Sequence, residues 1–137
     1  HPVVYKNPLT IPPVADWQGS VLVGAGWRPG WSTAFVACRM AQVLDAKVIL
    51  NLSNIDFVYD SDPRTNPQAQ ALESMRWRDY RQLVGDVWSP GLSAPFDPVA
   101  AKFCHQHGLS VAVINGQKLI EVEHAIAGGE FRGSVLA

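Results

Sequence analysis

The chain has few cysteines, few charges and no long hydrophobic run, and each shortage excludes a class of protein. Cys38 and Cys104 are its two cysteines, too few for a disulfide framework and not in the spacing of a zinc site. We expect both to be reduced thiols in the core. No apolar run approaches the roughly 20 residues of a membrane helix, and no signal sequence is visible. These features predict a cytoplasmic protein without a membrane partner.

Charge of either sign is scarce and balanced. Charged residues make up 17% of the chain, with 11 Lys and Arg against 12 Asp and Glu. The net charge of -1 gives no broad attraction for polyanions, so we expect no nucleic-acid partner. The chain does have 47% hydrophobic residues, which is enough over 137 residues for one packed core.

The first residues are punctuated by proline and start without methionine. Such a stretch is typical of a connector between folded parts. We therefore expect residues 1–19 to be a connector from a missing N-terminal half, and residues 20–137 to form the folded part.

Short apolar runs alternate with helical patterns along the rest of the chain. The expected strands are residues 20–23, 47–52, 110–114 and 133–136. The expected helices are residues 33–44, 69–81, 98–107 and 119–127. This alternation predicts an α/β fold with a parallel sheet between layers of helices. Because such sheets bind ligands beyond the carboxyl ends of their strands, the loops 24–32 and 53–67 are the candidate functional loops.

The first candidate loop reads GAGWRPGWST, residues 24–33. Its glycines let the backbone approach a ligand, and the helix N-terminus that follows offers N–H groups to an anion such as phosphate. Ser32 and Thr33 add hydroxyl donors, and Arg28 adds a positive charge. The pattern is neither Walker A nor GxGxxG. An ordinary strand-to-helix turn with tryptophans that only pack is the open alternative.

The second candidate loop, NLSNIDFVYDSDPRTNP, occupies residues 51–67. Tyr59 and Pro63 can form flat apolar walls for a purine, while an aspartate accepts from its exocyclic amine. The three aspartates also suggest a metal loop, but the central Gly and closing Glu of an EF-hand are absent. A plain polar surface loop remains the alternative.

Asp97 starts the segment DPVAAK, where Pro98 suits the first helical position. An aspartate there is usually an N-cap. The alternative is a carboxylate that orients a catalytic cation or a substrate donor.

In this order, the segments resemble the second half of the amino-acid-kinase fold and, within it, the uridylate kinases, including their archaeal-type branch. The markers are the glycine loop that ends in Ser-Thr, the string NIDFVYDSDP after a strand, the helix start DPVAAK and the closing FRGSV. The resemblance covers the chain from about Ser20 to its end. It implies a three-layer sandwich with a mainly parallel sheet, the carbamate-kinase-like fold, of which this chain carries the nucleotide-binding half.

The resemblance also assigns residues. Ser53, Tyr59 and Asp62 match positions that contact ATP, and Pro63 helps to shape the adenine pocket. Asp97 matches the carboxylate that orients the phosphate-binding lysine, and it is the expected catalytic residue. The positions that match the UMP-binding segment are Gly26, Trp27, Arg28, Pro29, Gly30, Trp31, Ser32 and Thr33.

The implied reaction is transfer of the γ-phosphoryl group from ATP to UMP, which gives ADP and UDP, with Mg²⁺ between the phosphates. Members of the family often assemble as homo-oligomers, including hexamers. The lysine and glycine-rich loop of the family's first half lie outside these residues. We therefore expect weak transfer by this chain unless a partner chain supplies that half.

Two positions depart from the family pattern. Ala34 stands where the family has a catalytic-site aspartate, and Asn54 stands where many bacterial members have lysine. The alanine leaves open a non-catalytic nucleotide-binding or storage protein on the same fold. A carbamate or amino-acid kinase is a third interpretation, although the Trp-rich loop offers few fixed cations for such acids.

Overall fold

The structure is a computed structural model that describes residues 7, 10, 21–87 and 94–137. Almost all of the expected connector therefore lies outside the described residues. The elements are, in order, α1 (Thr33–Val43), β1 (Val48–Ser53), β2 (Val58–Tyr59), β3 (Ala71–Leu72), β4 (Ser74–Met75), α2 (Trp77–Val84), α3 (Pro98–His107), β5 (Ser110–Asn115), α4 (Leu119–Ile126) and β6 (Gly133–Leu136).

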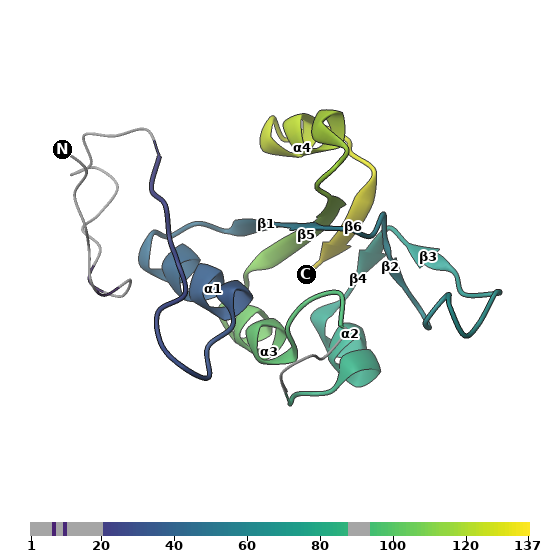
Figure 1. Ribbon diagram of the computed structural model, residues 1–137, viewed down its shortest axis with the longest axis horizontal. Coiled ribbons are helices and arrows are strands. Elements are labelled where there is room, and N and C mark those ends of the chain that lie inside the picture. Colours follow the sequence, from purple (N-terminus) through teal and green to yellow (C-terminus); the bar gives the residue numbers. More distant parts are fainter. Residues whose placement is uncertain (1–6, 8–9, 11–20, 88–93) are drawn as a thin grey trace.

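The described strands form a four-stranded sheet and a separate pair. The sheet has the order β1-β5-β6-β4, in which β1 runs parallel to β5, β4 runs parallel to β6, and β5 and β6 are antiparallel. The strands β2 and β3 form the antiparallel pair. Figure 1 shows α1, α2 and α3 on one side of the sheet and α4 on the other. The predicted α/β fold, with helices on both faces of a mainly parallel sheet, is confirmed.

The core lies between the sheet and the helices α1, α2 and α3. Strand β5 passes through the middle of the sheet, and Val111, Val113 and Ile114 are fully buried. This explains why its sequence is a continuous apolar run instead of an alternating one. Tyr80 from α2 and Phe103 from α3 pack in the same cluster as Val111 and Val113.

The two cysteines meet inside this core. The Sγ atoms of Cys38 in α1 and Cys104 in α3 lie 3.3 Å apart, and both thiols are free and fully buried. This confirms the expectation of reduced core thiols. The hydrogen bond between the two thiols, followed by burial, raises the pKa of Cys38 well above its usual range.

We expect this burial to protect both thiols from reagents. Because the thiolate is the reactive form, Ellman's reagent at pH 8 should modify the native protein at least about tenfold more slowly than the unfolded protein. Absorbance of the released thionitrobenzoate, measured with and without urea, tests this. The chain has no other cysteine, so the two rates report on this pair alone. Equal rates would show that the pair is accessible in the native state.

Two predicted elements are wrong. Residues 21–23 form no strand, and the side chains of Val21 and Val23 are 81% and 87% exposed. A doubly buried strand needs a hydrogen-bonded neighbour, whereas β1 pairs only with β5 among the described strands. Consequently the loop 24–32 does not follow a described strand, while the loop 53–67 follows β1 as expected.

The predicted helix 69–81 is also wrong in its first half. Residues 71–72 and 74–75 are strands, and the helix α2 begins at Trp77. The backbone of Glu73 accepts a hydrogen bond from the Val135 N–H, and the backbone of Met75 accepts one from the Ala137 N–H. Pairing of β3 with β2 and of β4 with β6 therefore overrides the local helical pattern. The other predicted helices and strands are confirmed to within one residue at each end.

Candidate functional site

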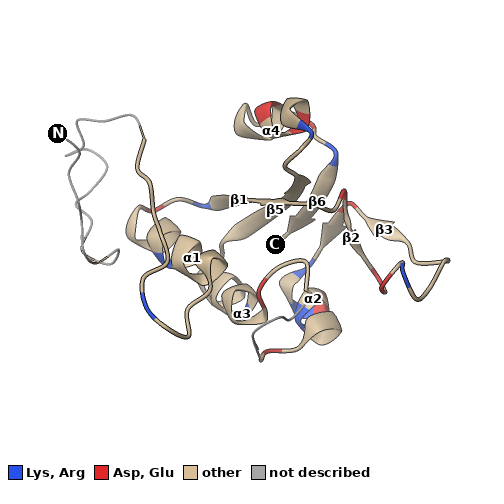
Figure 2. Ribbon diagram, viewed as in Figure 1, with Lys and Arg blue, Asp and Glu red and all other residues tan. Residues whose placement is uncertain are grey.

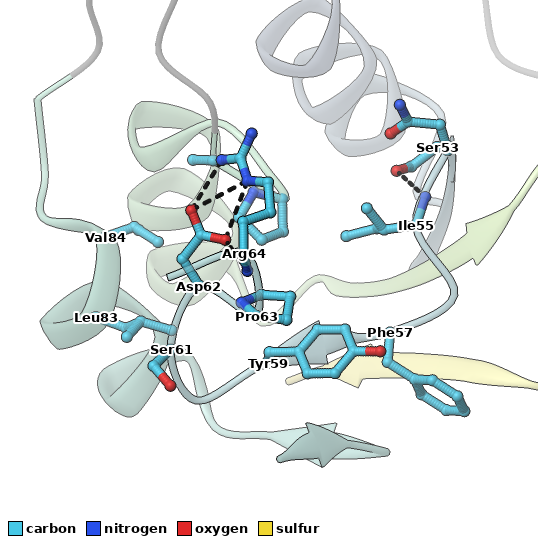
Figure 3. A pocket seen from close by; sticks show the side chains of 13 residues that line it. Ser53, Ile55, Phe57, Tyr59, Ser61, Asp62, Pro63, Arg64, Leu83 and Val84 are labelled. Atoms are coloured by element: carbon cyan, nitrogen blue, oxygen red, sulfur yellow. Dashed lines mark hydrogen bonds and ion pairs between the residues drawn. The ribbon is translucent and has the colours of Figure 1, made fainter. Parts of the chain in front are cut away.

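A pocket of about 650 Å³ lies where the loop after β1 passes the end of α2. Figure 3 shows Leu83 and Val84 of α2 next to Ser61 and Asp62, with Ser53 and Ile55 across from them. The pocket is lined by Ser53, Asn54, Ile55, Phe57, Tyr59, Ser61, Asp62, Pro63, Arg64, Leu83, Val84, Ala94 and Pro95. Its size is that of a small-molecule or cofactor site, and its walls combine apolar side chains with a few polar groups.

All four residues predicted on the ATP side line this one pocket. Ser53, Tyr59, Asp62 and Pro63 come from eleven consecutive residues, yet their side chains face a common space. Leu83 and Val84 of α2 also line the pocket, and the sequence did not indicate them. No local pattern marks those two residues, because only the fold brings α2 against the loop.

Phe57 is a further pocket residue that the sequence alone did not indicate. Phe57 is among the residues that line the pocket, and Figure 3 shows it next to Tyr59. The backbone bends at Asp56 and Phe57, so no strand-like alternation in the sequence marks this residue.

An ion pair shapes one rim of the pocket. The Asp62 Oδ2 atom lies 2.8 Å from Arg64 Nη2, and Asp62 Oδ1 accepts from both the Arg64 side chain and the Arg64 N–H. This pairing holds the pKa of Asp62 below its usual range, so the carboxylate is ionised at neutral pH. The Arg64 side chain stays 75% exposed and presents positive charge at the rim.

The other two aspartates of the loop have different partners. Asp60 closes the base of the β2–β3 connection, because its Oδ1 accepts from the Gln70 N–H at 2.9 Å and its N–H donates to the Gln70 carbonyl. Asp56 turns away to Asn115 and Lys118. Across the described residues, no group of three or more His, Cys, Asp or Glu side chains is placed to hold a metal ion. The metal-loop interpretation of these acids is therefore unsupported.

Side chains from the core fix the far wall of the pocket. The Asn51 Nδ2 of β1 donates to the Pro95 carbonyl at 3.1 Å, which ties the connection before α3 to the sheet. The Tyr80 hydroxyl forms two further hydrogen bonds with the backbone of Phe96. Asp97 follows directly, and its Oδ1 accepts from the Ala100 N–H at 2.8 Å, so it caps α3 as predicted.

The glycine loop is organised by its tryptophans. The rings of Trp27 and Trp31 meet edge to face at 5.1 Å, and the Arg28 guanidinium lies 4.8 Å and 4.4 Å from their centroids. Ser32 caps α1 by accepting from the Phe35 N–H. The structure does not bring this loop into the pocket described above, whose lining includes none of residues 26–33. The two tryptophans pack against each other, and the Arg28 guanidinium lies against both rings.

Ala34, the position of the family aspartate, is in the first turn of α1. Its half-buried side chain packs against the core cluster.

Charged residues of both signs lie in small groups over the described part of the chain (Figure 2). None of its helices has the length and apolar character that crossing a membrane requires.

A comparison with known protein families shows to which family the chain belongs. The pattern of the Amino acid kinase family matches residues 10–115. The chain belongs to the amino acid kinase family. The loop 53–64 and its pocket lie within the matched region, as does the glycine loop.

Individual relatives of this amino acid kinase chain are named uridylate kinases. One from Hyperthermus butylicus is 29% identical over 99% of the chain and 61% of its own length. One from Pyrobaculum calidifontis is 32% identical over 90% of the chain and 58% of its own length. The chain thus spans somewhat more than half the length of the curated relatives it matches.

Solved structures agree on the fold. The uridylate kinase from Archaeoglobus fulgidus superposes with a TM-score of 0.64 at 26% identity, over 82% of this chain and 50% of that one. The UMP kinase from Bacillus anthracis gives a TM-score of 0.67 at 20% identity, over 80% of this chain and 41% of that one. The predicted amino-acid-kinase fold is therefore confirmed.

Proposed function

We propose that this chain forms the ATP side of a phosphotransferase that moves the γ-phosphoryl group of ATP to UMP and releases ADP and UDP. The observation that carries the proposal is the single pocket that gathers Ser53, Tyr59, Asp62 and Pro63. The names of the relatives, uridylate kinase and UMP kinase, support it.

The pocket suits a purine nucleotide chemically. The Tyr59 ring and Pro63 offer flat apolar surface to a base, and Leu83 extends that surface from α2. Arg64 supplies a guanidinium for a phosphate, since guanidinium groups match phosphate oxygens geometrically. In the proposed reaction, ATP binds as its magnesium complex, in which phosphate oxygens carry the ion. That arrangement fits the pocket, because the Asp62 carboxylate is already paired with Arg64 and the phosphate oxygens carry the ion instead.

We place UMP at residues 26–33, next to the N-terminus of α1, where the backbone N–H groups of a helix start favour an anion. Asp97 is proposed to orient the cation that holds the transferred group. The proposed assembly is a homo-oligomer, with a hexamer as one form. A partner chain that carries the first half of the domain is the alternative source of the phosphate-binding lysine.

A second candidate function is nucleotide binding without transfer. The observation that favours it is Ala34, a methyl group packed against the core where the family pattern has a carboxylate. Such a protein would hold ATP in the same pocket but would lack one of the acidic groups of the reaction centre.

A coupled assay on the full-length protein separates the two functions. ATP, Mg²⁺ and a panel of acceptors that includes UMP and carbamate are supplied to the natural protein, to Ala34→Asp and to Ala34→Asn. We expect Ala34→Asp to raise UDP formation by at least about tenfold, because a positioned carboxylate contributes at least that much to catalysis. The amide variant controls for size. ATP binding without transfer to any acceptor in all three proteins would favour the binding function.

A further inference from the structure

Asp56 lies between two pocket residues but does not face the pocket. Its neighbours Ile55 and Phe57 line the cavity. The Asp56 carboxylate points the other way: Oδ1 accepts from Asn115 Nδ2 at 2.8 Å, and Oδ2 accepts from Lys118 Nζ at 2.7 Å. Asn115 is the last residue of β5 and Lys118 lies in the turn after it, about sixty residues later in the chain, so these hydrogen bonds connect the loop after β1 to the end of β5.

A second cation completes the cluster. The Arg132 Nη2 atom lies 3.7 Å from Asp56 Oδ2, and the same guanidinium lies 5.3 Å from the centroid of the Phe57 ring. The backbone N–H of Arg132 donates to Glu121 Oε2 at 2.7 Å, which fixes the chain just before β6. Arg132 therefore contacts both the buried side of the loop and the aromatic ring that lines the pocket.

The sheet brings these groups together. Strands β1 and β5 are parallel neighbours, and Ser53 is in register with Asn115. The Gly116 N–H donates to the Ser53 carbonyl at 2.9 Å, and a Cβ at Gly116 would lie 3.2 Å from the Cβ of Leu52. The turn after β5 thus sits directly on the end of β1. Lys118, at the N-cap of α4, is then within reach of Asp56.

This cluster is more sheltered than an ordinary surface pair. The side chains of Asp56 and Lys118 are 29% and 38% exposed, whereas those of Asp45 and Lys47, a similar pair at the other end of β1, are 86% and 72% exposed. The hydrogen bond from Lys118 and then that from Asn115 hold the pKa of Asp56 below its usual range. Charge-assisted hydrogen bonds that are partly screened from water constrain their groups more than exposed ones do.

We propose that Asp56, held by Lys118 and Arg132, is a positioning residue that fixes the pocket wall formed by Ile55 and Phe57 and so sets the affinity for a nucleoside triphosphate. This rests on the proposed function, because it names a residue that acts on the same site. Asp56 acts through its two neighbours and contacts no nucleotide itself.

The test compares Asp56→Asn, Lys118→Met and Lys118→Arg with the exposed control Asp45→Asn in the full-length protein. Titration calorimetry gives the Kd for ATP with Mg²⁺, and NMR hydrogen exchange follows the amides of residues 55–59. We expect Asp56→Asn and Lys118→Met to raise the Kd roughly tenfold and to speed exchange in residues 55–59. Lys118→Arg should retain most of the natural affinity for ATP and most of the natural protection from exchange. Asp45→Asn should change neither the Kd nor the exchange.

The two readouts separate this proposal from the proposed function. If the natural protein fails to bind ATP, the proposed function fails, while faster exchange confined to residues 55–59 still shows that Asp56 positions the wall. Unchanged exchange there in both Asp56→Asn and Lys118→Met would overturn the positioning role. Exchange that accelerates equally over the whole chain would overturn it as well, because the cluster would then contribute only general stability.

Discussion

Replacing Tyr80 by Phe is expected to lower the free energy of unfolding by about 2–3 kcal/mol, although the change removes a single oxygen atom. The Tyr80 side chain is fully buried, and its hydroxyl donates to the Phe96 carbonyl and accepts from the Phe96 N–H, both at 2.7 Å. Without the oxygen, both backbone groups lose this partner in the core. Burial raises the pKa of Tyr80 above its usual value, so the hydroxyl keeps its proton for the carbonyl even in alkaline solution.

The consequence reaches the pocket because of where Phe96 lies. Pro95, one residue earlier, is part of the pocket wall, and Asp97, one residue later, caps α3. Greater mobility of the Phe96 backbone in Tyr80→Phe should therefore also weaken ATP binding, as a smaller secondary effect.

Urea unfolding followed by circular dichroism measures the main effect of Tyr80→Phe. The matched control is Tyr59→Phe, which removes the same atom from a half-buried ring at the pocket and should stay within about 0.5 kcal/mol of the natural protein. Equal unfolding free energies for the two variants would mean that the Tyr80 hydrogen bonds contribute nothing net.

Local signals in the sequence were sufficient for several parts of the site. Asp97 caps the helix α3, as the segment DPVAAK predicts, and Ser32 caps α1, whose apolar pattern was also sufficient to predict it. The loop after β1 was identified by its position and residue types, since both are local properties. The strand predicted at residues 21–23 is absent because a strand forms only against a hydrogen-bonded neighbour. An apolar run in the sequence does not reveal whether that neighbour exists.

The roles of the three loop aspartates could not be separated by sequence alone. Asp56, Asp60 and Asp62 occur within seven residues and have the same chemistry. Their partners decide their roles: Asp60 and Asp62 bond within their own loop, whereas Asp56 reaches Lys118 on a distant turn. Such long-range pairing depends on the register of β1 with β5, which only the fold specifies.

Ser134 is another residue whose role depends on the fold and could not be predicted from the local sequence. In the sequence it is one residue of the closing FRGSV, with no pattern that marks it. In the structure it is fully buried, its hydroxyl accepts from the Val58 N–H at 2.8 Å and donates to the Leu72 carbonyl, and it thereby links β2 and β3 to β6. Val58 directly precedes Tyr59, so a single hydroxyl at the end of the chain supports the aromatic wall of the pocket.

Replacing Gly133 by Ala is expected to have the largest effect on stability, a loss of about 3 kcal/mol or more. A Cβ at this position would lie 2.5 Å from the Val113 carbonyl oxygen and 2.8 Å from the ring of Phe131. The first contact is with the backbone of the central strand, which cannot rotate away. Gly129→Ala is the control, because its Cβ would meet its nearest neighbour, the His124 carbonyl, at an ordinary 3.5 Å.

The same substitution should also weaken nucleotide binding, because β6 can relieve the clash only by moving away from β5. Gly133 pairs with Ile114, and the residues on either side of it, Arg132 and Ser134, are the two that support the pocket from behind. Unfolding free energy and the Kd for ATP are therefore expected to change together in Gly133→Ala and to stay near natural values in Gly129→Ala. A destabilised Gly133→Ala that binds ATP normally would mean that β6 does not transmit its position to the loop 55–59.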